Sequence, residues 1–124
     1  MAMITSHRDL KLWQRAIELG VAAYRIARAL PEDERFALGL QLRRSAVSVA
    51  SNVAEGFGRG SRADYVRFLR MARGSLRELD TQIEFVERLE YAGRSDLVEV
   101  RGLLDECSRM SGALITRLKG GGAR

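Results

Sequence analysis

The amino-acid sequence predicts an all-α protein that folds as an antiparallel up-down-up-down four-helix bundle. Apolar residues recur at steps of three and four positions in four long segments, which is the period of an amphipathic helix. The single proline and the glycines around positions 58 and 93 separate these segments by short links, which favour antiparallel neighbours. No segment alternates apolar and polar residues over a useful length, so we expect no β-sheet. A length of 124 residues suits one domain, residues 1–124, with a core of its own.

The first helix is expected at about residues 9–30, where two adjacent apolar stripes indicate a broad buried face. One stripe is Leu10, Trp13, Ile17, Gly20, Tyr24 and Ala27, and the other is Leu12, Ala16, Leu19, Ala23 and Ile26. We therefore expect Trp13 and Tyr24 in the core rather than on the surface as base-stacking side chains. Pro31 stops this helix, and the acidic residues that follow it suit the start of the next.

The second helix is expected at about residues 33–56. Its predicted core stripe is Phe36, Leu40, Val47, Ala50 and Ala54. Many of its other residues are serine and alanine, whose small side chains let helix axes approach closely.

The third helix is expected at about residues 62–92, and the fourth at about residues 95–119. Ser61 resembles the N-cap of a capping box in which Asp64 replaces the usual glutamate, and Gly93 suits a C-terminal stop. The third helix has a heptad seam of Tyr65, Leu69, Ala72, Leu76, Leu79, Ile83 and Val86. The fourth has a seam of Leu97, Val100, Leu104, Cys107, Ser111, Leu114 and Leu118, and residues 120–124 are expected to form a flexible tail.

Charge is sorted along the chain. Residues 35–77 hold nine arginines and two acids, whereas residues 78–106 hold nine acids and three arginines. The net charge of the chain is +5, which permits a nucleic-acid partner without requiring one. Such a separation of basic and acidic segments is typical of a protein that binds a polyanion or a second copy of itself.

A basic stripe on the third helix is the candidate nucleic-acid surface. Arg67, Arg70, Arg73 and Arg77 recur at steps of three and four, and Arg59 and Arg62 extend the stripe at the preceding turn. The first three are expected to lie off the helix-packing seam, so that their loss would leave folding intact. A solvated charged face is the alternative interpretation. The order of basic then acidic residues opposes the helix macrodipole, which favours a partner over simple solvation.

The second helix carries a polar cluster made of Arg43, Arg44, Ser48, Ser51, Asn52 and Glu55. Five of these residues share one helical face, and they need hydrogen-bond partners if that face is buried. The cluster could be a ligand or nucleic-acid site, or a hydrogen-bond network between helices or subunits. The network is favoured because the cluster contains no histidine, no nucleophile–base pair and no set of metal ligands.

Catalysis, cofactors and membranes are not indicated. The glycine-rich turn at residues 56–60 lacks the spacing of a phosphate-binding loop, and His7 stands alone, so we expect no enzyme activity, no metal and no cofactor. The single cysteine, Cys107, suits a reducing compartment and a small core residue. No apolar run approaches the length of a membrane span, and no signal peptide is evident, so a cytoplasmic location is expected.

Four segments resemble one protein family. They are Leu12-Trp13-Gln14, the block from Gln41 to Gly56 (QLRRSAVSVASNVAEG), and Phe68-Leu69 with Gly74 to Leu79 (GSLREL). The chain resembles, over roughly residues 7–118, the bacterial four-helix-bundle proteins encoded in intervening sequences of 23S rRNA genes, the S23 family, which are related to accessory proteins of diversity-generating retroelements. The resemblance implies a four-helix bundle and a homo-oligomer, most often a pentameric ring. The retroelement relatives bind nucleic acid and a reverse transcriptase through basic surface.

Two hypotheses of function follow. In the first, a homo-oligomeric bundle without enzyme activity binds RNA or DNA backbone through its arginine-rich surface. In the second, the protein is a structural or adaptor protein whose charges serve self-assembly and the docking of a protein partner. Salt-dependent binding to RNA distinguishes the two.

Overall fold

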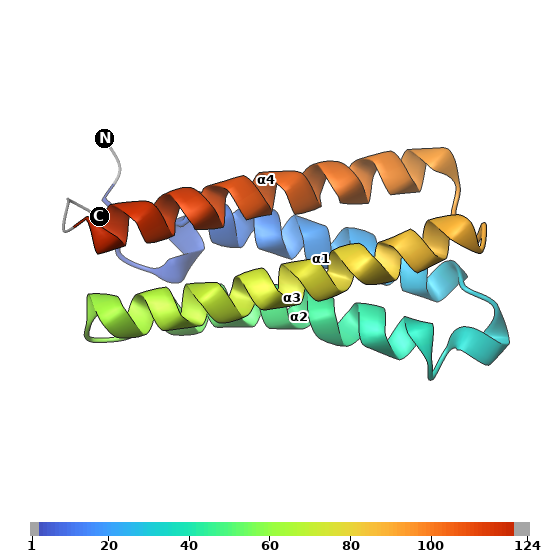
Figure 1. Ribbon diagram of the computed structural model, residues 1–124, viewed down its shortest axis with the longest axis horizontal. Coiled ribbons are helices and arrows are strands. Elements are labelled where there is room, and N and C mark those ends of the chain that lie inside the picture. Colours follow the sequence, from blue (N-terminus) through green and yellow to red (C-terminus); the bar gives the residue numbers. More distant parts are fainter. Residues whose placement is uncertain (1–2, 121–124) are drawn as a thin grey trace.

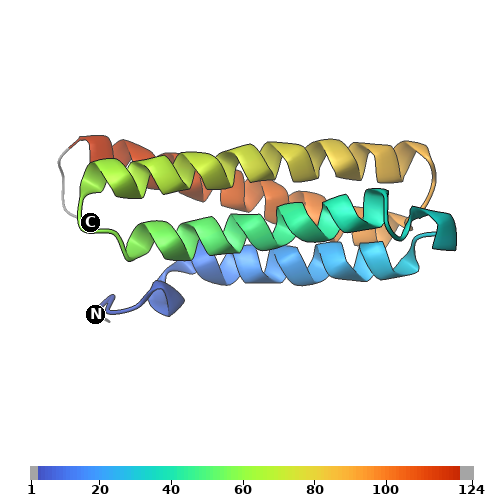
Figure 2. The ribbon, with the colours of Figure 1, turned by 90° about the horizontal axis from the view of Figure 1, so that it is seen from below.

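A computed structural model describes residues 3–120 of the chain. It contains four α-helices, α1 (Lys11–Ala29), α2 (Leu38–Phe57), α3 (Arg62–Arg88) and α4 (Arg94–Lys119), with short 3-10 helices at His7–Asp9 and Glu32–Glu34. Within this described part there is no β-strand, so the all-α class is confirmed. The helices lie side by side as one elongated bundle (Figures 1 and 2). The predicted flexible tail, apart from Gly120, lies outside the described residues.

The core runs along the middle of the bundle. Contacts join α1 to α2, α2 to α3, α3 to α4 and α4 back to α1, so each helix has two principal neighbours. The seam predicted for α3 is buried throughout, and six of the seven seam residues of α4 are buried, with Leu97 half-buried. Both heptad predictions are confirmed. No helix in residues 3–120 combines the length and the apolarity needed to cross a bilayer.

Helix α1 buries only one of its two predicted stripes. Leu12, Ala16, Leu19, Ala23 and Ile26 are in the core, whereas Ile17 is 40% exposed and Tyr24 39% exposed. The prediction that Tyr24 is a core residue is therefore wrong, and Trp13 is only half-buried. The reason is that the adjacent helix α2 faces this side of α1 with small residues such as Ala46 and Ala50, which leave a groove between the two helices.

Helix α2 begins later than predicted. A 3-10 turn at Glu32–Glu34 and an irregular residue, Ala37, with φ −109° and ψ −100°, precede it, so the chain is not one continuous helix from residue 33. Glu34 holds the junction in place. One carboxylate oxygen accepts the backbone N–H of Leu38 at 3.4 Å, and the other accepts the Tyr91 hydroxyl at 3.1 Å. The hydrogen bond to Glu34 also raises the pKa of Tyr91.

The core stripe of α2 also differs from the prediction. Phe36 is 75% exposed and Val47 50% exposed, and Leu40 and Ala54 are half-buried. Only Ala50 of the predicted stripe is buried. The buried face instead carries Leu42, Ala46, Val49 and Val53. Small residues on both sides of the helix make the apolar stripe hard to recognise. The predicted core face therefore lies about a quarter of a turn from the face that is buried.

Helix α3 ends at Arg88, before the predicted limit of 92. Glu90 takes the left-handed conformation, with φ 59°, that usually favours glycine. The backbone N–H of Tyr91 then donates to the carbonyl of Val86 at 2.9 Å, and that of Glu90 donates to the carbonyl of Glu87 at 3.0 Å. These two bonds form a Schellman motif. Gly93 is therefore not the stop of α3, as predicted, but the N-cap of α4.

Helix α3 starts at the cap that the sequence indicates. The Ser61 hydroxyl accepts the backbone N–H of Asp64 at 3.1 Å. The carboxylate of Asp64 pairs with Arg67 at 2.9 Å. The cap therefore fixes the first turn of α3 and with it the start of the basic stripe.

Candidate nucleic-acid interface

The outer face of α3 is basic from its first turn to Arg77. Arg67, Arg70 and Arg77 are exposed there. Arg67 is partly engaged, because it pairs with Asp64 and lies over the ring of Phe68 at 4.6 Å. The side chains of Arg70 and Arg77 form no ion pair or hydrogen bond with any residue between 3 and 120. Their charges are therefore available to a partner.

The acidic second half of α3 is, in contrast, largely neutralised within the chain. Glu84 pairs with Arg88 at 2.8 Å and with Arg101 at 3.0 Å, and Arg101 also reaches Glu87 at 2.6 Å. Hydrogen bonds from Arg88 and Arg101 lower the pKa of Glu84. The acidic charge of α3 is thus partly balanced by Arg101 of α4, whereas Arg70 and Arg77 have no acidic partner within residues 3–120.

Arg73 does not belong to the solvated stripe. Its Nη1 donates to the carbonyl of Ser108 at 2.6 Å and to the hydroxyl of Ser111 at 2.9 Å, both on α4. A side chain at Gly112 would place its Cβ 3.0 Å from the same nitrogen. Arg73 therefore ties α3 to α4, and the prediction that it lies off every helix-packing seam is wrong.

Arg59 and Arg62 lie where α2 passes into α3. Arg59 pairs with Glu55 at 3.0 Å, lies 3.8 Å from Asp64, and stacks over Phe68 at 4.6 Å. Arg62 is exposed and lines a shallow cleft of about 300 Å³ together with Arg70. Arg59 is thus held by acids, and Arg62 extends the exposed basic surface.

The same cleft includes residues that the sequence reasoning missed. Leu118 and Lys119, in the last turn of α4, line it opposite α3, and Arg117 lies beside Arg62 in a neighbouring pocket. Arg117 and Lys119 are both exposed. The sequence could have indicated these residues, because an α4 that returns along α3 must bring its C-terminal turn next to the start of α3. We use the name basic end surface for the exposed cations at this end of the bundle together with those on the adjoining outer face of α3: Arg62, Arg67, Arg70, Arg77, Arg117 and Lys119.

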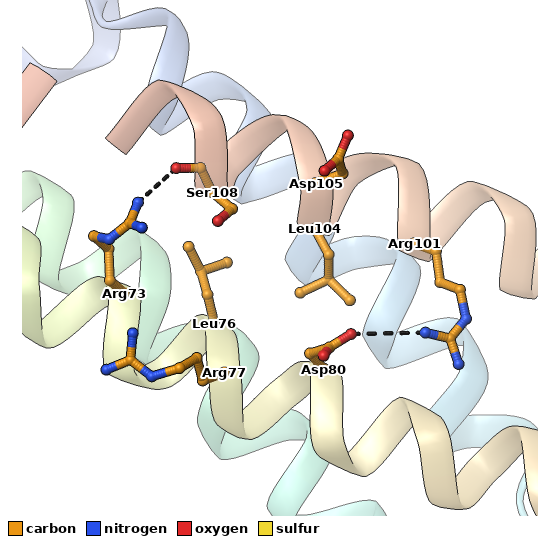
Figure 3. Close-up of a pocket in the computed structure, with 8 residues that line it drawn as sticks. All are labelled: Arg73, Leu76, Arg77, Asp80, Arg101, Leu104, Asp105 and Ser108. Carbon is orange, nitrogen blue, oxygen red and sulfur yellow. Dashed lines mark hydrogen bonds and ion pairs between the residues drawn. The ribbon is translucent and has the colours of Figure 1, made fainter. Parts of the chain in front are cut away.

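A second cleft, of about 400 Å³, lies between α3 and α4 (Figure 3). We call it the α3–α4 cleft, and its lining residues are Arg73, Leu76, Arg77, Asp80, Arg101, Leu104, Asp105 and Ser108. Figure 3 shows the guanidinium groups of Arg73 and Arg77 at one end and Asp80 facing Arg101 at the other, 3.6 Å apart. The cleft is therefore charged at both ends, and one end is cationic.

The polar cluster of α2 divides into two parts. Ser48 and Asn52 are half-buried against α3, where the Ser75 hydroxyl donates to the Ser48 hydroxyl at 2.8 Å. The Asn52 amide donates to the Ser48 carbonyl at 2.9 Å and to its hydroxyl at 3.0 Å. These three residues form a small network between α2 and α3.

The rest of the polar cluster does not join that network. Arg44, Ser51 and Glu55 are exposed, and Glu55 pairs with Arg59. Arg43 is half-buried, and its guanidinium donates to the carbonyl of Arg35 at 3.3 Å. Arg44 and Glu55 therefore lie outside the network between α2 and α3.

An apolar groove separates α1 from α2. It encloses about 600 Å³ and is lined chiefly by apolar residues, among them Ile17, Val21, Tyr24 and Val47. Each of these four side chains is 39–50% exposed. We call it the α1–α2 groove. Contiguous exposed apolar surface of this kind is typical of an interaction site.

Chemically reactive groups are few in this structure. Cys107 is fully buried, and burial raises the pKa of its thiol to about 12, so the reactive thiolate is suppressed. Across residues 3–120, no three histidine, cysteine or carboxylate side chains gather in the way that a metal ion requires.

Comparisons with known proteins agree with this architecture. A crystal structure of a protein of unknown function from the S23 ribosomal protein family of Bacteroides thetaiotaomicron has the same fold, with a TM-score of 0.78 and 24% sequence identity. The match covers 84% of this chain and 97% of that one. Among curated protein sequences, none matches the chain significantly. The family model of the 23S rRNA-intervening sequence protein matches residues 8–113. The chain therefore belongs to the 23S rRNA-intervening sequence protein family.

Proposed function

We propose that this protein is a homo-oligomeric, antiparallel up-down-up-down bundle of the cytoplasm, without enzyme activity, that binds the backbone of RNA or DNA through its basic end surface. One observation carries the proposal. Arg70 and Arg77 are exposed on α3 without an acidic partner in residues 3–120, whereas Glu84 and Glu87 farther along α3 are paired with arginines. Arginines left unpaired in this way are suited to phosphate.

The physical basis of binding is electrostatic. Each guanidinium can neutralise one phosphate and release a condensed counterion, and its planar fork can hold two phosphate oxygens. The basic end surface offers no evident base-reading motif, so contacts to the backbone should carry most of the affinity. In an oligomer the surface is repeated, which strengthens weak contacts through avidity. The resemblance to the S23 family supports the same function, because the retroelement accessory proteins expected to be related to that family bind nucleic acid through basic surface.

Fluorescence anisotropy with a labelled RNA tests this function. We expect binding at ~50 mM salt that weakens steeply by ~200 mM, because released counterions oppose binding at higher salt. A wild-type protein that leaves the anisotropy unchanged at ~50 mM salt would refute the proposal.

We propose that the oligomer forms through the α1–α2 groove and that it is the pentameric ring implied by the family resemblance. A ring needs a heterologous interface, in which one surface of a subunit meets a different surface of the next subunit. The groove supplies one apolar surface. Arg28, at the rim of the groove, is an exposed cation without a partner in the described chain. Glu78 on α3 is an exposed acid that also has no partner there. The two side chains therefore suit opposite sides of the interface.

Light scattering of a groove variant tests the assembly. Val21→Asp places a charge in the α1–α2 groove and should reduce the mass to that of a monomer, 13.9 kDa. Val98→Asp is the matched control, because Val98 is 63% exposed on α4 and lies outside the groove. A wild-type mass of 13.9 kDa at micromolar concentration contradicts the oligomer.

A structural or adaptor role is the second candidate function, and the same groove favours it. Its apolar lining could hold a helix of a protein partner instead of a second copy. A pull-down from lysate with and without nuclease separates the candidates. A partner retained after nuclease treatment, together with absent RNA binding, would favour the adaptor.

A further inference from the structure

The α3–α4 cleft has two chemically different ends. At one end Arg77 is unpaired within residues 3–120, and the neighbouring Arg73 is held in position by the carbonyl of Ser108. Figure 3 shows both guanidinium groups on the same side of the cleft. Two guanidinium groups that line the same end of a cleft, one fixed and one free, suit a phosphate there.

The other end of the cleft accepts hydrogen bonds. Asp80 is 64% exposed, and the one ion pair that it forms within residues 3–120, to Arg101, is long at 3.6 Å. Arg101 is satisfied more closely by Glu84 and Glu87. The Asp80 carboxylate therefore keeps acceptor capacity toward the cleft. Asp105 lines the same region from α4.

Between the two ends the cleft has an apolar floor. Leu76 and Leu104, from opposite helices, are 5% and 6% exposed (Figure 3). Aliphatic side chains of this kind can hold the flat face of an unstacked base. The volume of about 400 Å³ lies within the range of small-ligand sites.

We propose that the α3–α4 cleft binds one unpaired nucleotide of a nucleic-acid strand. Its phosphate lies on Arg77 and Arg73, its base covers Leu76 and Leu104, and an amino group of the base donates to Asp80. This inference rests on the proposed nucleic-acid binding and adds that the protein prefers single strands with amino-bearing bases. The preference arises because a duplex hides the face of each base by stacking and engages its amino group in a base pair.

Oligonucleotide binding tests the contribution of the base. The probe is a labelled deoxycytidine strand of about 12 nucleotides, long enough for a single-strand site. The comparison strands have the same length and charge, one with abasic positions and one with thymidine, which presents an acceptor where cytidine presents an amino donor. We expect the cytidine strand to bind at least about five-fold more tightly than either. Equal affinity for the cytidine and abasic strands would overturn the inference.

A second, independent test is whether the affinity rises or falls when one negative charge of the cleft is removed. Asp80→Ala removes one negative charge, which by electrostatics alone should strengthen binding to a polyanion. The inference predicts the opposite for the cytidine strand, a loss of affinity of about five-fold, because the amino group loses its acceptor. Asp96→Ala is the matched control, since Asp96 is an exposed acid on α4 that lies outside both the α3–α4 cleft and the α1–α2 groove. This control should bind as well as the wild type or better.

Thermal melts of both variants establish that they fold, which the exposure of the two side chains leads us to expect. Tighter binding by Asp80→Ala would overturn the nucleotide site and leave backbone binding standing. Failure of the wild type to bind any strand at ~50 mM salt would overturn the proposed function as well. The two failures are therefore distinguishable.

Discussion

Arg73 differs from its neighbours on α3 because its guanidinium is committed to α4. Its two hydrogen bonds reach Ser108 and Ser111, and Ser111 is fully buried. Arg73→Gln should lower the free energy of unfolding by about 1–3 kcal/mol, since a shorter side chain leaves these α4 oxygens without their charged donor. The measurement is chemical denaturation followed by circular dichroism.

Arg70→Gln is the matched control for this prediction. Arg70 loses the same charge one turn away, but its side chain is exposed and contacts no partner in the described chain. Its stability should stay within about 0.5 kcal/mol of the wild type. Equal stability of the two variants would show that Arg73 does not tie α3 to α4.

Cys107 should be inert in the native protein. Burial, with a smaller contribution from Glu106, raises its pKa from 9.0 to about 12. We expect no reaction with a disulfide reagent at neutral pH until the protein is unfolded by guanidinium. The folded state keeps the thiol proton longer than the unfolded state. The stability from this group is therefore complete below pH 9.0 and is lost as the pH rises toward about 12.

The contact of α2 with α3 depends on Gly56. A Cβ at this position would lie 2.9 Å from the Phe68 Cβ and 3.2 Å from the Tyr65 carbonyl. Gly56→Ala should therefore destabilise the protein by about 1–3 kcal/mol through overpacking, despite the better helix propensity of alanine. Gly74→Ala is the control, because no atom lies within 4 Å of its added Cβ. It should stabilise the protein by up to about 1 kcal/mol. A stabilised Gly56→Ala variant in thermal melts would contradict the close packing.

The helices were predictable to different degrees because their core residues differ in size. In α3 and α4, large apolar side chains at heptad spacing mark a single seam, and the structure buries it. In α2, alanine and serine occupy both sides, so exposed Phe36 and Val47 were mistaken for core residues. The junction before α2 depends on Glu34 and Tyr91, which are 57 positions apart. A pattern in one segment cannot show a bond of that range.

The candidate interface was predictable as a charge pattern but not as a surface. The steps of three and four place four arginines on one arc of α3, and only the position of α4 decides that Arg73 is covered while Arg70 and Arg77 are not. The position of α4 also brings Arg117 and Lys119 to the start of α3. Both facts are tertiary, so they follow from the packing of the helices and not from the local sequence.

The dependence of affinity on salt is the most direct test of the basic end surface. The protein is titrated with duplex DNA over a range of salt concentrations, and the slope of log K against log salt is compared between variants. The test variant is Arg70→Gln with Lys119→Gln, both exposed on that surface. The control is Arg44→Gln with Arg94→Gln, which removes two exposed charges elsewhere. Both variants have the same net charge.

The account predicts that the test variant flattens the slope by about 0.9 for each lost phosphate contact, whereas the control keeps the slope of the wild type. Equal slopes for the two variants would show that binding follows net charge alone, and would contradict a nucleic-acid interface at the basic end surface.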